Sequence, residues 1–140
     1  MTYKLTRRGL IKTSAAVAAG LKLGLAPAIL RARGLNEKLN VACIGIGGQG
    51  GYSIGGVSQE NIVALCDVDD QRASKQYDKH PAAKKFYDFR KMFDAMEKEI
   101  DAVTVCTPDH THFLPAMWAL QRGKHLYCEK PMAHNVWEVR

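Results

Sequence analysis

The sequence lacks the patterns that mark a disulfide framework or a metal site. Its four cysteines include no Cys-x-x-Cys pair, and each lies in or at the end of an apolar run: Cys43, Cys66, Cys106 and Cys128. Such positions are typical of small core residues, and we expect the thiols to be reduced. His110 and His112 follow Asp109 closely, but zinc requires three or four ligands. The sequence therefore predicts neither a disulfide nor a metal site.

Acidic residues are absent from residues 1–34, whereas the rest of the chain is balanced in charge. The first segment holds seven basic residues: Lys4, Arg7, Arg8, Lys12, Lys22, Arg31 and Arg33. Beyond it stand 13 basic and 14 acidic residues, so the formal net charge of +6 arises in the N-terminal segment. Because nucleic-acid binding needs a basic face on the folded part, we expect no binding to DNA or RNA.

The N-terminal segment, residues 1–34, has the pattern of a twin-arginine export signal. Arg7-Arg8 is followed by an alanine- and glycine-rich stretch over residues 14–30, and Ala26-Pro27-Ala28 has the small residues of a cleavage site. Lys22 interrupts the stretch, which makes it a poor transmembrane helix. The alternative is a basic amphipathic helix. We predict export by the twin-arginine translocation machinery to the periplasm or another extracytoplasmic compartment.

A glycine-rich loop follows the first apolar run of the folded part. Residues 41–44 are apolar, and the next six form a G-x-G-x-x-G pattern: Gly45, Ile46, Gly47, Gly48, Gln49 and Gly50. A second apolar run ends at Asp67, 22 positions after Gly45, close to the spacing of a dinucleotide-binding βαβ unit. Gly45 permits a tight turn, Gly47 a close approach to pyrophosphate, and Gly50 close helix packing. The alternative is a glycine-rich turn in some other α/β protein.

Beyond this loop, apolar runs alternate with helical patterns. Strands are predicted over residues 39–45, 61–66, 85–87, 102–106 and 125–128, and helices over 70–79, 90–98, 113–122 and from 135 onward. Asp88 is the expected cap of one helix, and Gly123 the expected end of another. This order predicts an α/β fold over residues 38–140, with a Rossmann-type doubly wound parallel sheet that is incomplete at its C-terminus. Ligands of such sheets gather at the carboxyl ends of the strands.

Three blocks together resemble the Gfo/Idh/MocA oxidoreductases, the glucose–fructose oxidoreductase and inositol dehydrogenase group. They are the glycine loop, then Thr107-Pro108-Asp109-His110-Thr111-His112, then Glu129-Lys130-Pro131. The resemblance covers about residues 38–140. It implies a domain that binds NAD or NADP, and a second α/β domain, outside this sequence, that supplies most of the substrate pocket. The implied reaction is hydride transfer between the nicotinamide and a hydroxyl or ketone of a sugar or cyclic polyol.

The resemblance also implies individual roles. The expected cofactor-binding residues are Gly45, Ile46, Gly47, Gly48, Gln49, Gly50, Asp67, Arg72, Thr107, Pro108, His112, Glu129 and Lys130. Asp67 would bind the adenosine ribose and repel a 2′-phosphate, which favours NAD over NADP, whereas Arg72 is placed to pair with such a phosphate or to stack on adenine. Lys130 would be catalytic, donating a hydrogen bond to the substrate oxygen as hydride leaves. Pro131 is a candidate for a cis peptide bond.

Two other hypotheses stay open. The first is an NAD-dependent glycosidase of the same fold, which oxidises the sugar transiently and then eliminates the aglycone. That group usually has a tryptophan-rich loop where this chain has Asp109-His110-Thr111-His112, and it lacks a plain Glu-Lys-Pro. The second is a catalytically inert nucleotide-binding fragment, because the chain ends inside a predicted helix.

The export signal and the glycine loop support each other. The twin-arginine route carries proteins that have already folded, so an exported NAD enzyme would load its cofactor in the cytoplasm. We therefore expect the cofactor to stay bound through catalysis. We also expect the full-length protein to form a homo-oligomer.

Overall fold

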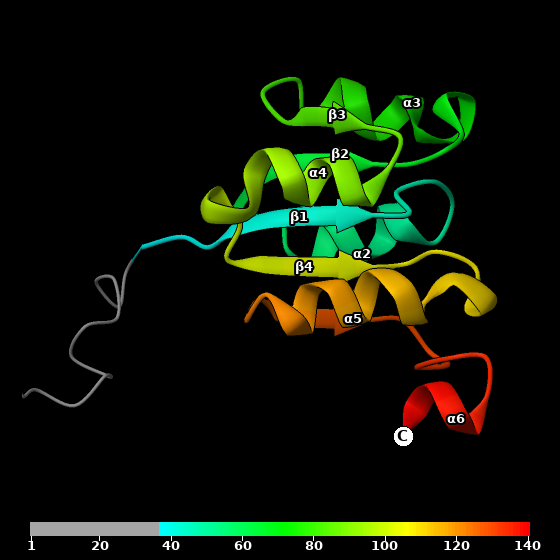
Figure 1. The fold of residues 1–140 in the computed structure, drawn as a ribbon. Coiled ribbons are helices and arrows are strands. Elements are labelled where there is room, and N and C mark those ends of the chain that lie inside the picture. Colours follow the sequence, from blue (N-terminus) through cyan, green and yellow to red (C-terminus); the bar gives the residue numbers. More distant parts are fainter. Residues whose placement is uncertain (1–36) are drawn as a thin grey trace, which may run out of the picture. The chain divides into compact units, whose positions relative to one another are not determined.

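The computed structural model describes residues 37–140, and the predicted export signal lies outside the described residues. Figure 1 shows one sheet with helices packed on it. In chain order the elements are β1 (Asn40–Ile44), α2 (Gly50–Gly56), β2 (Asn61–Cys66), α3 (Asp70–Lys79), β3 (Lys84–Phe86), α4 (Phe89–Met96), the 3₁₀ turn η2 (Glu97–Glu99), β4 (Ala102–Val105), the 3₁₀ turn η3 (Asp109–Thr111), α5 (Phe113–Gln121), β5 (His125–Cys128) and α6 (Val136–Val139).

The five strands form one parallel sheet in the order β3-β2-β1-β4-β5. Val41 pairs with Ile62 and Ala42 with Ala64, so β2 carries a one-residue irregularity at Val63. The chain builds outward from β1 through β2 to β3, and then returns to the other side of β1 for β4 and β5 (Figure 1). This reversal places the switch point of the sheet between β1 and β4, where α/β proteins bind their ligands. The predicted doubly wound sheet is confirmed.

Both faces of the sheet are covered, and the residues of β1 alternate between two cores. Ala42 and Ile44 pack in a core with residues of α4 and α5, and Val41 and Cys43 pack in a core with residues of α2 and α3. Figure 1 shows α4 and α5 in front of the sheet and α2 behind it. Successive strand side chains point to opposite faces. Burial on both faces therefore explains why β1 and β4 are apolar runs rather than alternating patterns.

The helices begin and end near the predicted caps, and the largest difference is at the end of α4. The Asp88 carboxylate accepts a hydrogen bond from the Arg90 backbone N–H at the start of α4, and Gly123 has a φ of +66° after α5. α4 ends at Met96 rather than at residue 98, because a tighter 3₁₀ turn follows and leads to Ile100, which is buried in the core. β3 lies one residue earlier than predicted, and the other boundaries agree within one residue.

Two buried thiols make the domain lose stability as the pH rises through the alkaline range. Burial raises the pKa of Cys43 to about 11 and that of Cys66 to about 12, from an ordinary 9.0. The folded state holds these protons more tightly than the unfolded state, so their contribution is complete below pH 9.0 and is lost as the pH rises toward 11 and 12. We expect the free energy of unfolding to fall by up to about 1.4 kcal/mol per pH unit for each thiol in that window.

Denaturant unfolding across the alkaline range measures this effect. Cys43→Ala combined with Cys66→Ala is the control, and this variant should show a flatter pH profile above pH 9.0. An equally steep profile in the double variant would contradict the assignment. All four cysteines are free thiols in the structure.

Within residues 37–140 no helix has the length and apolar character that a membrane crossing requires. The same part of the chain has no group of three or more His, Cys, Asp or Glu side chains placed to hold a metal ion. The two neighbouring histidines differ in environment, since His110 is exposed on η3 and His112 is buried.

Candidate functional site

The glycine loop joins β1 to α2 and lies at the carboxyl edge of the sheet. The Gly45 N–H donates to the carbonyl of Cys66 at 2.8 Å, and the Cys106 N–H donates to the carbonyl of Ile44 at 2.9 Å. These bonds tie the beginning of the loop to the residues that end β2 and follow β4. The loop is therefore held at the switch point of the sheet.

Close backbone contacts require glycine at two positions of the loop. Gly45 has a φ of +76°, and a Cβ there would lie 2.7 Å from the carbonyl carbon and oxygen of Cys106. A Cβ on Gly50 would lie 1.8 Å from the carbonyl oxygen of Gly45. Helix α2 thus begins in direct contact with the turn that precedes it, which is the close packing that the third glycine of this motif permits.

The Asp67 carboxylate braces the glycine loop from the end of β2. Its Oδ2 accepts hydrogen bonds from the backbone N–H groups of Ile46 at 2.8 Å and Gly47 at 2.9 Å, and its Oδ1 accepts one from Asp69 at 3.0 Å. An ionised carboxylate has about four acceptor positions. Three are used by the backbone, so one position on Oδ1 is left for a ligand hydroxyl.

Two further N–H groups of the loop, those of Gly48 and Gln49, have no acceptor among residues 37–140. Both residues are exposed, and Gln49 immediately precedes α2. Unpaired N–H groups at the start of a helix attract phosphate. The donors available to a pyrophosphate are therefore Gly48 and Gln49, because the N–H groups of Ile46 and Gly47 are bound to Asp67.

A cavity of about 620 Å³ opens at this edge of the sheet, within the size range of ligand pockets. The glycine loop and the segments after β2 and β4 form its walls. Seven of the predicted cofactor-binding residues line it: Gly45, Gly47, Gln49, Asp67, Arg72, Thr107 and Pro108. The structure thus brings residues from three separate parts of the sequence into one cavity.

Thr107 carries an unpaired polar atom at this cavity. Its Oγ1 is buried and has no hydrogen-bond partner among residues 37–140, while the residue lines the cavity. Buried hydroxyls nearly always have a partner, and a hydroxyl or amide of a nicotinamide nucleotide would supply one. Together with the open position on Asp67 and the free N–H groups of Gly48 and Gln49, this atom fits a dinucleotide.

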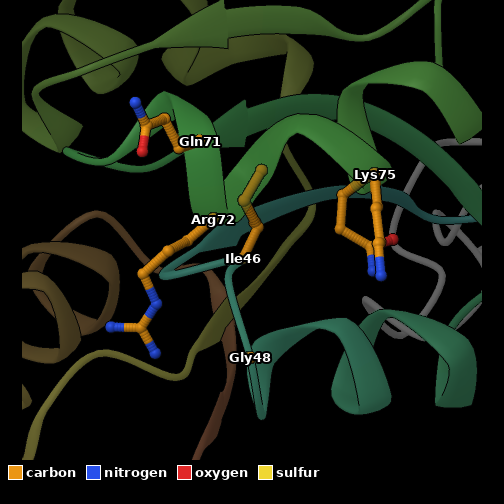
Figure 2. Close-up of a pocket in the computed structure, with 6 residues that line it drawn as sticks. Ile46, Gly48, Gln71, Arg72 and Lys75 are labelled. Atoms are coloured by element: carbon orange, nitrogen blue, oxygen red, sulfur yellow. The ribbon is translucent and has the colours of Figure 1, made fainter.

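A second pocket, of about 390 Å³, lies between α3 and the glycine loop. Figure 2 shows Gln71, Arg72 and Lys75 projecting from α3 beside Ile46 and Gly48 of the loop. Arg72 lines both this pocket and the larger cavity, and its Nη2 would lie 3.2 Å from a Cβ on Gly48. The charged side chains of the pocket are both positive, which favours a phosphate near this part of the loop.

The predicted Glu-Lys-Pro segment follows β5 at the same edge of the sheet. The Glu129 N–H donates to the carbonyl of Val105 at 2.9 Å, and its Oε1 accepts hydrogen bonds from Ser53 Oγ at 3.4 Å and from the Tyr127 hydroxyl at 3.2 Å. The hydrogen bond between the Tyr127 hydroxyl and the Glu129 carboxylate raises the pKa of Tyr127. Lys130 is exposed and forms no ion pair within residues 37–140, and the Lys130–Pro131 bond is cis, as expected.

His112 lies under this segment rather than on the wall of the cavity. It is only 1% exposed, and its Nδ1 lies 2.6 Å from the carbonyl oxygen of Pro131. Neither His112, Glu129 nor Lys130 is among the residues that line the larger cavity. Their direct contact with a cofactor stays a prediction.

Several residues of the site were missed by the sequence analysis. Tyr127 lies in β5, two positions before Glu129, which directly follows the strand. In extended chain this spacing places both side chains on the same side, and this signal was available. Ser53 carries no such signal, because it reaches Glu129 only through the packing of α2. Phe89 and Leu114 add apolar surface to the cavity from α4 and α5. The contribution of Phe89 and Leu114 to the cavity depends on tertiary structure and carries no local sequence signal.

The switch-point cavity and its braced glycine turn are the architecture of a dinucleotide-binding α/β domain. Comparison with known protein families agrees with this class. The family described as an oxidoreductase family with an NAD-binding Rossmann fold matches residues 39–140. The chain belongs to this family, the Gfo/Idh/MocA oxidoreductases, and the resemblance seen in the three sequence blocks is confirmed.

Two curated relatives have the same identity to this chain. Inositol 2-dehydrogenase from Rubrobacter xylanophilus is 31% identical over 113 residues, which covers 77% of this chain and 31% of the relative. A glycosyl hydrolase family 109 protein from Solibacter usitatus is 31% identical over 159 residues, covering 97% of this chain and 36% of the relative. The chain thus spans about a third of the length of these relatives.

A solved structure shares the fold. The WlbA dehydrogenase from Bordetella pertussis, in complex with NADH and UDP-GlcNAcA, has a TM-score of 0.64 and 24% identity to this chain. The match covers 73% of this chain and 32% of that structure. The likeness therefore concerns the fold of about a third of that structure.

Proposed function

We propose that residues 38–140 are the nucleotide-binding domain of an NAD(P)-dependent oxidoreductase that acts on a sugar or cyclic polyol. The carrying observation is the cavity at the switch point, where the glycine loop, Asp67 and Thr107 meet. Membership of the oxidoreductase family and the 31% identity to an inositol 2-dehydrogenase support this proposal. The substrate domain lies outside the present sequence in this proposal.

Different residues of the domain would bind different parts of the cofactor. The N–H groups of Gly48 and Gln49 would donate to the pyrophosphate, and the open position on Asp67 Oδ1 would accept a ribose hydroxyl. Glu129 would approach the nicotinamide ribose. When bound, NAD would supply the hydride acceptor. Lys130 would donate a hydrogen bond to the substrate oxygen and stabilise its negative charge, which is the role of an electrostatic catalyst.

A direct test uses the full-length protein, purified from its own host and examined by native mass spectrometry. A subunit with the added mass of NAD or NADP is expected. Hydride transfer is then followed by absorbance of the reduced nicotinamide during incubation with inositols and sugars. Failure to bind either nucleotide would overturn the proposal, and binding without turnover on any hydroxyl substrate would reduce it to nucleotide binding alone.

Asp67 is expected to set the preference for NAD over NADP. Its carboxylate would repel the 2′-phosphate of NADP and accept a ribose hydroxyl of NAD. In Asp67→Asn the charge is lost and one oxygen becomes a donor, so we expect the affinity for NAD to fall about tenfold or more, since hydrogen bonds to charged groups contribute about 1.5–3 kcal/mol. The ratio of NAD to NADP affinity should fall as well.

Titration calorimetry with both nucleotides measures this ratio. Asp78→Asn removes a charge from an exposed position on α3 and is the matched control, for which the ratio should be unchanged. Equal ratios in Asp67→Asn and the native protein would show that another residue selects the cofactor, with Arg72 the first to test.

A second candidate function has a specific observation in its favour. The glycosyl hydrolase family 109 protein covers 97% of this chain at 31% identity, so an NAD-dependent glycosidase of the same fold is the alternative. Such an enzyme would release an aglycone from a chromogenic glycoside without net formation of NADH. A dehydrogenase would instead form NADH in proportion to the polyol oxidised, and the two measurements separate the candidates.

We also propose export by the twin-arginine route, with the cofactor bound before export and retained afterwards. The proposal rests on Arg7-Arg8 and the apolar stretch that follows. Replacing both arginines by lysine should keep the protein in the cytoplasm, which cell fractionation would measure. An unchanged distribution would contradict it.

Sedimentation of the full-length protein tests the expected homo-oligomer, with a monomer as the contradicting result.

A further inference from the structure

We infer that His112 is a positioning residue whose Nδ1–H holds the Pro131 carbonyl and thereby fixes the segment that presents Lys130. The inference rests on the proposed function, because it gives His112 a task relative to the catalytic lysine. The His112 ring lies against the segment after β5, and its expected contact with the cofactor is a separate prediction.

The hydrogen bond fixes the protonation of the ring. His112 Nδ1 lies 2.6 Å from the carbonyl oxygen of Pro131, and a carbonyl oxygen can only accept, so the proton must be on Nδ1. The other nitrogen, Nε2, is buried without a partner among residues 37–140. A second proton there would create a buried cation with an unsatisfied N–H. The arrangement therefore fits a neutral ring with its proton on Nδ1.

His112 is itself held rigidly. Its N–H donates to the carbonyl of Asp109 at 3.3 Å, and its carbonyl accepts from the Ala116 N–H at 3.2 Å in the first turn of α5. Upstream, both the N–H and the hydroxyl of Thr111 donate to the Pro108 carbonyl, at 2.8 and 2.7 Å. The ring is 1% exposed, so it has little freedom to leave the carbonyl.

The segment around Lys130 is anchored on both sides. On one side, the Glu129 N–H donates to Val105 and its carboxylate accepts from Ser53 and Tyr127. On the other side, the His112 ring binds the Pro131 carbonyl, and the Cys128 thiol donates to the next carbonyl, that of Met132, at 3.9 Å. Lys130 stands between two fixed points while its side chain is exposed. Removal of the His112 bond would loosen the segment after Lys130 without touching the glycine loop, while the Lys130 N–H still donates to the Glu129 carboxylate at 3.2 Å.

The experiment compares His112→Phe with His112→Asn in the full-length protein. Phenylalanine keeps a ring but has no donor, whereas the asparagine Nδ2 lies close to the place of the histidine Nδ1 and can still donate. We expect His112→Phe to lower kcat by about tenfold or more, since small misplacements of catalytic groups are costly. The Kd for NAD should change by less than about threefold, and asparagine should restore most of the kcat.

Two readouts do not depend on turnover. Nitrogen-15 NMR of the histidine rings should report Nδ1–H for His112, and hydrogen exchange over residues 129–133 should accelerate in His112→Phe but not in His112→Asn. If the native protein lacks hydride transfer, the proposed function fails while these readouts still test the anchor. An Nε2–H ring, equal exchange in both variants, or a loss of NAD affinity as large as the loss of kcat would each overturn the inference.

Discussion

Among substitutions of single glycines of the loop by alanine, we expect Gly50→Ala to cause the largest loss of stability. The new Cβ would lie 1.8 Å from the Gly45 carbonyl oxygen and 2.8 Å from its carbonyl carbon. Both are backbone atoms, so no side-chain rotation can relieve the contact, and α2 must move away from the sheet. We expect a loss of about 3 kcal/mol or more in the free energy of unfolding, at or above the upper end of overpacking effects.

The same helix offers a matched control. Gly55 also belongs to α2, but a Cβ there would meet no atom within 4 Å. Gly55→Ala adds the same methyl group and improves helix propensity, so it should stabilise the protein by up to about 1 kcal/mol. Denaturant unfolding of both variants measures the difference. Equal stabilities would show that the packing of α2 on the Gly45 turn is looser than the structure indicates.

The largest effect on catalysis is expected from Lys130→Met. Methionine keeps most of the aliphatic length and removes the ammonium group, so only the hydrogen bond and the charge are lost. If Lys130 stabilises the developing charge on the substrate oxygen, kcat should fall by about 10²- to 10⁴-fold, the usual contribution of a positioned acid or base. If the group acts on the transition state alone, the Kd for NAD should stay within about threefold.

Lys98→Met serves as the control for a lost surface charge. Lys98 is exposed on η2, which precedes β4 and so lies at the amino edge of the sheet, away from the cavity. It should leave kcat and the Kd for NAD unchanged. A Lys130→Met enzyme with native kcat would remove the lysine from the mechanism. A parallel loss of NAD affinity would instead make it a cofactor-binding residue.

The sequence was sufficient to predict the elements and the loop. Apolar runs bounded by turn residues located β1, β2 and β4, because buried strands leave an unbroken signal. The edge strands β3 and β5 are more exposed and carry a weaker signal. The spacing from Gly45 to Asp67 located the loop, because the motif is local to one βαβ unit. Both signals lie within a few tens of residues, where sequence distance and spatial distance still correspond.

The contacts inside the site could not be predicted in the same way. That Asp67 accepts from the loop N–H groups, rather than being free for ribose alone, depends on the side-chain rotamer at the end of β2. That Ser53 reaches Glu129, 76 residues later, depends on how α2 packs on β1 and β4. That His112 meets the Pro131 carbonyl depends on the pairing of Val105 with Cys128, which sets how far β5 extends beside β4.

The three hydrogen bonds accepted by Asp67 limit how this domain can change its cofactor during evolution. A simple route from NAD to NADP removes the acid that repels the 2′-phosphate. Here that substitution would also release the N–H groups of Ile46 and Gly47 and leave them to find new acceptors. If Asp67 selects NAD as proposed, one side chain sets both the cofactor selectivity and the integrity of the loop. A lineage that gains NADP would have to begin with the positive charges already present at Arg72 and Lys75, and lose the acid only afterwards.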